Sequence, residues 1–188
     1  MISRENVWVA AVVVLLLVVA GSGPVMAQSS CPFTVTGSLA PGDATSNPRL
    51  FRDEPPNACG VDQPCATSAC AACALDVYTL ATPPGPNPAC VQVTVTTPCV
   101  GTQFTHASAW LGVFAPPFAC NANFLGDIGA SPDLGAPKAF SFNVPPATTF
   151  SVVINEVTAG GGCPTYQIDV TGCDQTPVEL IDLSIHKP

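Results

Sequence analysis

Ten cysteines give this 188-residue chain its main chemical potential, and two of them form a Cys-x-x-Cys motif, Cys70-Ala71-Ala72-Cys73. Redox-active and zinc-binding sites share that spacing. A redox role requires a helix N-terminus within a βαβ unit, and no such pattern surrounds the motif. Zinc requires a second ligand pair, and Cys59 and Cys65 are spaced too widely to supply one. We therefore expect structural disulfides.

All of the cysteines follow a hydrophobic N-terminal segment, which is typical of an oxidised, exported protein. The sequence does not determine their connectivity, because even eight cysteines allow about a hundred pairing patterns. Placement of the cysteines around the expected strands and loops favours three pairs, and two more follow by elimination. The three are Cys31 with Cys173, Cys59 with Cys65, and Cys99 with Cys120; the two are Cys90 with Cys163 and Cys70 with Cys73.

Acid–base chemistry has few candidates in the sequence. His106 and His186 are the only histidines, and neither lies in a recognised catalytic motif. A small secreted hydrolase that uses His106 with a serine and an acid is an alternative hypothesis, although His106 fits a strand and His186 lies in a terminal tail. Glycoside hydrolysis would need two carboxylates from Asp127, Asp133 and Glu156, and no aromatic cleft is evident. We expect no catalytic residues.

Ligand and metal sites are equally sparse. Asp127 and Asp133 with loop carbonyl groups would suit calcium, but their spacing matches no EF-hand loop, which favours solvated carboxylates and no cofactor. Four aromatic residues would form a sugar-stacking platform if they were exposed: Trp110, Phe114, Phe118 and Phe124. In a chain with few large residues, such positions are more typical of the core.

Residues 1–27 have the form of a signal peptide. Residues 7–20 are fourteen consecutive apolar residues, fewer than the roughly 20 that span a bilayer, and Val25-Met26-Ala27 suits cleavage after Ala27. An uncleaved anchor is the alternative. No later segment is long and apolar enough to cross a membrane. The formal charge of −8 offers no basic surface and argues against nucleic acid as a partner. A secreted or cell-surface location is expected.

Alternation of apolar and polar residues predicts β-strands along much of the chain. Five segments show it clearly: 33–39, 91–96, 140–144, 150–157 and 166–171. Segments 75–81 and 106–114 alternate more weakly, and the second is apolar on both faces, as in a central strand that is covered on both sides. About seven short strands between Pro- and Gly-rich turns predict an all-β fold, a β-sandwich of jelly-roll type.

The remaining segments define loops and boundaries. Two stretches without periodicity, 49–73 and 119–138, are predicted to be long loops, and the first holds four cysteines that would pin it. We place a signal peptide at 1–27, the β-sandwich domain at 28–174, and a C-terminal tail or extra edge strand at 175–188. Residues 178–185 of that tail alternate loosely between apolar and polar.

Several segments resemble secreted bacterial β-sandwich modules of the pre-peptidase C-terminal-like family. They are 49–53, 78–80, 90–95, 110–114, 123–127, 142–145, 150–157 and 163–166. The resemblance covers most of the mature chain and implies an accessory module beside other exported domains. Four cysteines depart from the family pattern: Cys31, Cys70, Cys73 and Cys173. Residues 181–187 are similar to the opening strand of the Ig-like repeats that often follow such modules.

These observations predict an exported, disulfide-stabilised and non-catalytic module. It would act in binding or adhesion outside the cell or at its surface, or as an accessory spacer, through loops on a rigid scaffold. The expected partner is a surface polysaccharide or another exported protein domain. A subunit of an envelope assembly that pairs through an edge strand, such as 178–185, is the alternative.

Overall fold

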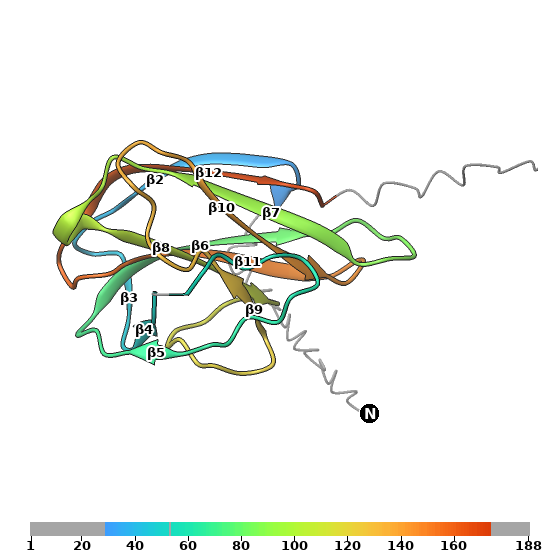
Figure 1. The fold of residues 1–188 in the computed structure, drawn as a ribbon, viewed down its shortest axis with the longest axis horizontal. Coiled ribbons are helices and arrows are strands. Elements are labelled where there is room, and N and C mark those ends of the chain that lie inside the picture. The colour runs from blue at the N-terminus through green and yellow to red at the C-terminus, as the bar shows by residue number, and fades with distance from the viewer. Residues whose placement is uncertain (1–28, 53, 174–188) are drawn as a thin grey trace, which may run out of the picture.

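The fold is a sandwich of two β-sheets in a computed structural model that describes residues 29–52 and 54–173 (Figure 1). The first sheet has the order β1-β6-β11-β8-β9, with β3 also paired to β6; the second has the order β10-β7-β12-β2; β4 and β5 form a small separate pair. The bounds are β1 Ser29–Ser30, β2 Phe33–Leu39, β3 Ala44–Ser46, β4 Arg49–Leu50, β5 Thr67–Ser68, β6 Cys73–Ala81, β7 Ala89–Thr96, β8 Thr105–Leu111, β9 Phe124–Asp127, β10 Lys138–Val144, β11 Thr149–Glu156 and β12 Cys163–Thr171, with a 3-10 turn at Gly101–Gln103.

The predicted all-β sandwich is therefore correct. Successive long strands alternate between the sheets so that β2-β12-β7-β10 faces β6-β11-β8-β9, an order consistent with a jelly roll. Pairing is antiparallel throughout, apart from the two-residue strand β1, which runs parallel to β6.

All seven predicted strands are present; β2 has the predicted bounds, and the other six have shifted ends. The strand predicted at 106–114 is β8 and stops at Leu111, because Gly112 takes a φ of 79° that ends the extended chain. The two predicted long loops contain short strands: β4 and β5 lie in 49–73, and β9 lies in 119–138. Strands of two to four residues are too short to show a period.

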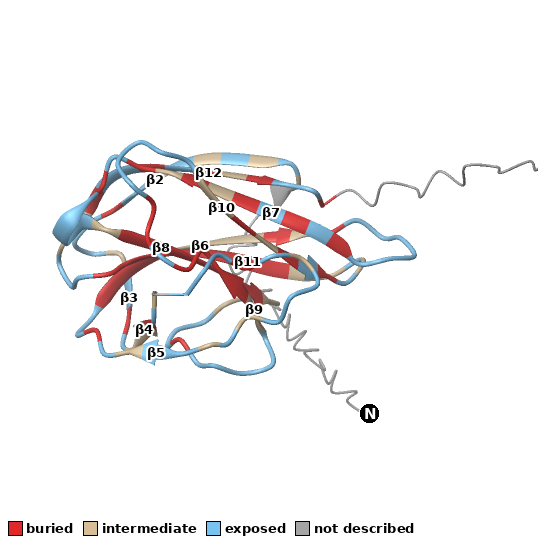
Figure 2. Cartoon of the chain, viewed as in Figure 1, coloured by how far each residue is buried: buried red, intermediate tan, exposed pale blue. Residues whose placement is uncertain are grey.

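A large apolar core fills the space between the two sheets (Figure 2). Val91, Val93 and Val95 of β7 point into it, and Gln92 and Thr94 between them do not. Phe142 and Phe150 meet in this core, with ring centroids 5.8 Å apart. The alternation that predicted the strands is thus the burial pattern itself.

A second apolar cluster covers the outer face of the first sheet. Leu50, Leu75, Trp110, Phe118 and Val153 form it; Leu50 comes from β4 and Phe118 from the loop between β8 and β9 rather than from the first sheet. As a result, all residues of β8 except Leu111 are buried. The prediction that this strand is covered on both sides is confirmed.

All ten cysteines are paired. The disulfides are Cys31–Cys173, Cys59–Cys90, Cys65–Cys120, Cys70–Cys73 and Cys99–Cys163. The pairs Cys31–Cys173 and Cys70–Cys73 are the expected ones. The predicted pairs Cys59–Cys65, Cys99–Cys120 and Cys90–Cys163 are wrong.

Strand adjacency explains the three corrected pairs. Cys99 follows β7 and Cys163 begins β12, and these strands are antiparallel neighbours whose ends meet. Residues 55–59 cross from β9 to β10, which brings Cys59 to Cys90 on β7. Cys65–Cys120 joins the two loops that cover the outer face of the first sheet. None of these neighbours is adjacent in sequence.

The predicted signal peptide, 1–27, and the predicted tail, 175–188, lie outside the described residues. In the part of the chain that the structure describes, no helix is long and apolar enough to cross a membrane.

Candidate functional site

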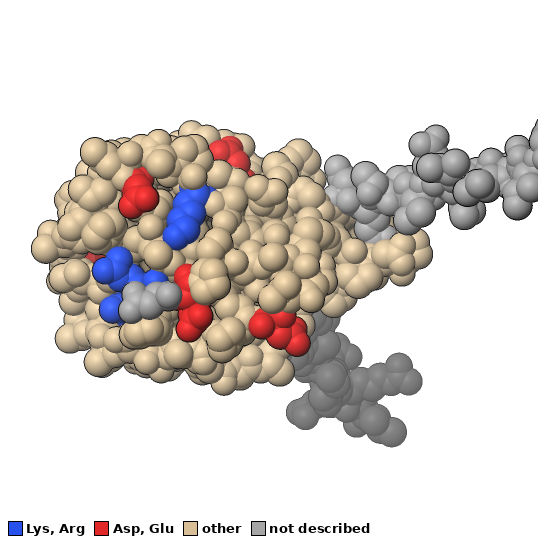
Figure 3. Space-filling model, in the orientation of Figure 1, with Lys and Arg blue, Asp and Glu red and all other residues tan. Residues whose placement is uncertain are grey.

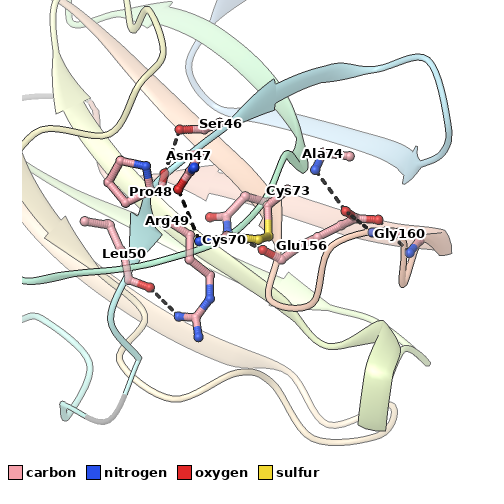
Figure 4. Close-up of a disulfide and its surroundings, with 12 residues drawn as sticks. Ser46, Asn47, Pro48, Arg49, Leu50, Cys70, Cys73, Ala74, Glu156 and Gly160 are labelled. Atoms are coloured by element: carbon pink, nitrogen blue, oxygen red, sulfur yellow. Dashed lines mark hydrogen bonds between the residues drawn. A yellow bond between two sulfur atoms is a disulfide. The ribbon is translucent and has the colours of Figure 1, made fainter.

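The Cys70–Cys73 disulfide closes the turn that leads into β6 (Figure 4). Both cysteines are buried, and the backbone N–H of Cys70 donates to Asn47 Oδ1 at 3.3 Å. Ala72 lies between them with a positive φ of 68°. Reactive Cys-x-x-Cys motifs have an accessible thiolate at a helix N-terminus, whereas this one is buried at the start of a strand. Its role is structural, and no cysteine is left as a thiolate for zinc.

His106 is buried on β8, and neither of its ring nitrogens is hydrogen-bonded to a hydroxyl group. Its Nε2 lies 3.0 Å from the carbonyl oxygen of Gly129 and 3.7 Å from Asp127 Oδ1. Because a carbonyl only accepts, Nε2 carries the proton, and Nδ1 is buried without a hydrogen-bond partner. An activated serine must hydrogen-bond the imidazole. The described residues therefore do not assemble the triad of the hydrolase hypothesis, and His186 lies outside them.

Asp127 fastens one long loop to β9. Its Oδ1 accepts from the backbone N–H of Gly129 at 2.6 Å and from Gln63 Nε2 at 3.0 Å, and its own N–H donates to Gln63 Oε1 at 2.8 Å. Burial raises the pKa of Asp127 to about 6 and lowers the pKa of His106 to about 3. At neutral pH the site is thus a neutral imidazole beside a hydrogen-bonded carboxylate.

Glu156 is a second buried carboxylate with a structural environment. It accepts from the backbone N–H groups of Ala74 and Gly160 at 2.9 and 3.2 Å (Figure 4). It also accepts from the backbone N–H of Gly162 at 2.6 Å. These bonds hold the turn after β11 against the start of β6. Strand β8 separates Glu156 from Asp127, since they pair with Thr105 and Ser108 respectively. The two carboxylates are not brought together as a catalytic pair.

Asp133 lies exposed in a turn, where its carbonyl oxygen accepts from Ala136 N–H at 3.2 Å. Among residues 29–52 and 54–173, no group of three or more His, Cys, Asp or Glu side chains is arranged to hold a metal ion. The face in Figure 3 is mostly uncharged, with basic and acidic side chains interspersed.

The four aromatic residues proposed as a sugar-stacking platform pack against one another, but mainly inside the second apolar cluster. Trp110 is 3% exposed and Phe118 is 2% exposed, while Phe114 and Phe124 are half-buried. Ring centroids lie 5.2 Å apart for Trp110–Phe114 and 4.9 Å apart for Phe114–Phe118. The expectation that core packing is favoured over an exposed platform is confirmed for Trp110 and Phe118.

A hollow of about 210 Å³ opens beside this cluster, and we call it the β8 hollow. Its wall includes Trp110, Val113, Phe114, Pro117, Asn121 and Asn123. Aromatic residues and two asparagines thus line one hollow, which the sequence did not predict. Two asparagines two residues apart in a Pro-rich loop are too common a pattern to mark a site.

Hydrogen bonds and a disulfide fix the walls of the β8 hollow. Asn123 N–H donates to Asn121 Oδ1 at 2.9 Å, and Leu111 N–H donates to the carbonyl oxygen of Asn123 at 2.7 Å. On the other side, Phe114 N–H donates to Ser151 Oγ at 3.0 Å. With the Cys65–Cys120 disulfide, these contacts make the loop 112–123 a rigid part of the scaffold.

A second group that sequence reasoning missed lies where β6 approaches β2 and β12. The Tyr166 hydroxyl donates to Asp76, and it lies 2.7 Å from the Tyr78 hydroxyl. Burial raises the pKa of Asp76 and of both tyrosines. Gly37 leaves the space that these hydroxyl groups occupy. An interior glycine in an alternating strand was the available signal.

The fold and the β8 hollow together define a disulfide-stabilised β-sandwich module. No family model matches the chain, and no curated protein matches it. Among solved structures, the C-terminal CBM6 of LamC, a marine laminarinase from Zobellia galactanivorans, matches 72% of this chain and 99% of its own length, with 12% identity and a TM-score of 0.31. The fold assignment rests on the strand pairing of this chain itself, and the pre-peptidase C-terminal-like resemblance stays a prediction.

Proposed function

We propose that this chain is an exported, non-catalytic module that binds polysaccharide at or beyond the cell surface, with the β8 hollow as its binding site. One observation carries the proposal: the half-buried Phe114 lines the same hollow as the exposed Asn121 and Asn123. A sugar ring presents C–H groups to an aromatic face and hydroxyl groups to amides. Small-ligand sites combine these two kinds of surface.

Export is supported by the cysteines and by the N-terminal sequence. Five disulfides form and persist in an oxidising compartment, and residues 1–27 are proposed as the signal peptide. Beside other exported domains, the module would hold its ligand or act as a spacer, as the pre-peptidase C-terminal-like resemblance implies.

The proposed mechanism is binding by a preformed surface. His106, Asp127 and Glu156 are buried and hydrogen-bonded to backbone groups, so their part in the proposal is to hold loops rather than to transfer protons. A rigid loop loses little conformational entropy when a ligand binds, which favours affinity from a small contact area.

The test fills the β8 hollow without removing a contact. Ala115 is exposed and lines the hollow, so Ala115→Trp should block it. Leu134, which is 67% exposed and outside the hollow, provides the matched control Leu134→Trp. The secreted protein is tested by retention on a panel of insoluble and soluble polysaccharides, followed by calorimetry.

We expect retention on at least one polysaccharide, a loss of about tenfold or more in affinity for Ala115→Trp, and no change for Leu134→Trp. Asn123→Ala should weaken binding as well. Retention that is equal in the native protein and in Ala115→Trp would place the binding site elsewhere. If no polysaccharide on the panel retains the native protein, the proposal is wrong.

A further inference from the structure

The sandwich has four lateral sheet edges, and short segments cover three of them. Strands β1 and β3 lie on the edge of β6. Asn57 covers both β9 and β10, because its N–H donates to the Asp127 carbonyl oxygen at 3.0 Å and its carbonyl oxygen accepts from Ser141 N–H at 2.9 Å. The fourth edge is β2, which in the described part of the chain pairs with β12 alone.

Strand β2 also lacks the usual protection of a free edge. Its seven residues contain no charged side chain and no proline. Natural edge strands are typically blunted by charge, by proline or by a covering segment, because their unpaired N–H and C=O groups attract another strand.

The main core is incompletely covered at the same edge. Five residues pack against that core while only partly buried, and four of them lie at or beside the β2–β6 side: Cys31, Phe33, Val35 and Tyr78. Figure 2 shows β2 as intermediate and exposed while the inner strands are buried. Another strand on this edge would bury apolar surface in addition to pairing the backbone.

We propose that residues 178–185 of this same chain occupy the edge, as an added strand parallel to β2. The Cys31–Cys173 disulfide holds Cys173 beside the start of β2, with the two Cα atoms 5.7 Å apart. The chain that follows Cys173 therefore begins at the correct end of the open edge. Residues 174–177 need to reach only from β12 to the far side of β2, which is two strand spacings or about 10 Å.

The sequence of the segment fits this position. Ile181, Leu183 and Ile185 alternate with Asp182 and Ser184, so over 181–185 one face of the added strand would be apolar and the other polar. Residues 178–180, Val-Glu-Leu, do not follow this alternation. The apolar face would extend the cover over Phe33 and Val35. Tethering through the disulfide raises the effective concentration of the segment, which favours its own β2 over that of another molecule. The proposal is independent of the β8 hollow.

The test is residue-level amide hydrogen exchange by NMR on the secreted protein at two concentrations. Leu183→Asp puts a charge on the proposed apolar face, and Ser184→Asp puts the same charge on the opposite face. In the native protein, the alternate β2 amides that point away from β12 should exchange about tenfold or more slowly than in Leu183→Asp. Ser184→Asp should behave as the native protein does.

Ile181→Asp serves as a second disrupting variant and should repeat the effect. Unchanged exchange of β2 in both Leu183→Asp and Ile181→Asp would overturn the proposal. Protection of β2 that appears only at the higher concentration, together with a dimer in sedimentation, would also overturn it, because the segment would then pair with a second copy.

Discussion

Gly37 of β2 and the hydroxyl group of Tyr166 on β12 share one small space at the side of the sandwich. A Cβ atom at position 37 would collide with that hydroxyl oxygen and with the hydroxyl oxygen of Tyr78. The glycine is therefore required by the tyrosines. They in turn join the two sheets through the hydrogen bonds to Asp76 and to each other.

Gly37→Ala should destabilise the fold by about 1–3 kcal/mol, the usual cost of overpacking a filled site. Equilibrium unfolding in guanidinium with the disulfides intact measures the change. Ser38→Ala provides the control, because Ser38 is exposed on the same strand, and it should shift stability by less than about 0.5 kcal/mol. Equal midpoints for the two variants would contradict the packing argument.

Two buried groups should give opposite pH dependences of stability. The lowered pKa of His106, about 3 against 6.5, gives a contribution that is present above pH 6.5 and is lost as the pH falls through about 3. The raised pKa of Asp127, about 6 against 3.8, gives a contribution that is present below pH 3.8 and is lost as the pH rises through about 6. Between pH 4 and 6 the two slopes oppose each other.

The variant Asp127→Asn separates the contribution of Asp127 to the pH dependence of stability from that of His106. An asparagine Oδ1 can keep the bonds from Gly129 and Gln63, but the variant no longer titrates at this position. Relative to the native protein, its stability should fall on acidification from about pH 6 to pH 4, by up to about 1.4 kcal/mol per pH unit. Denaturation curves at half-unit pH intervals test this. Parallel stability profiles for variant and native protein would show that Asp127 does not titrate as described.

The Cys65–Cys120 disulfide should support the outer cover of the first sheet. Replacing both residues by alanine is expected to cost about 2–4 kcal/mol, because the bond closes a chain segment with a sequence separation of 55. The unfolding midpoint and the acrylamide quenching of Trp110 are the readouts, and quenching should increase as the cover loosens. Unchanged quenching at full loss of the disulfide would mean that the apolar cluster alone holds the loops.

Ser108 should stabilise the fold through its hydrogen bond with Trp110. The buried indole Nε1–H donates to Ser108 Oγ at 2.9 Å, so Ser108→Ala leaves that donor unpaired at a cost of about 1–3 kcal/mol. Unfolding monitored by circular dichroism measures this cost. In a double-mutant cycle with Trp110→Phe, the second loss should be smaller in the background of the first. Additive losses would show that the bond contributes little.

The fold could be predicted from the sequence because the order of apolar and polar residues in each long strand matches which of its faces are buried. The alternating valines of β7 and the doubly apolar β8 are local signals. The pairing of Cys59 with Cys90 has no such local signal, because it depends on where residues 55–59 cross between the sheets. The β8 hollow was not predictable for the same reason: Asn123 and Phe114 line one hollow only after the loop 112–123 has folded onto the outer face of the sheet.

The Cys31–Cys173 disulfide also has a mechanical consequence. It joins the chain just before β2 to the chain just after β12, so every strand from β2 to β12 lies within one covalently closed loop, and β1 lies outside it. Once β1 has been pulled from β6, tension applied to the segments that flank this bond passes through the two sulfur atoms, and strands β2 to β12 carry none of it. Strands of an anchored module with this geometry would stay folded under a steady pull or under flow, until the bond was reduced.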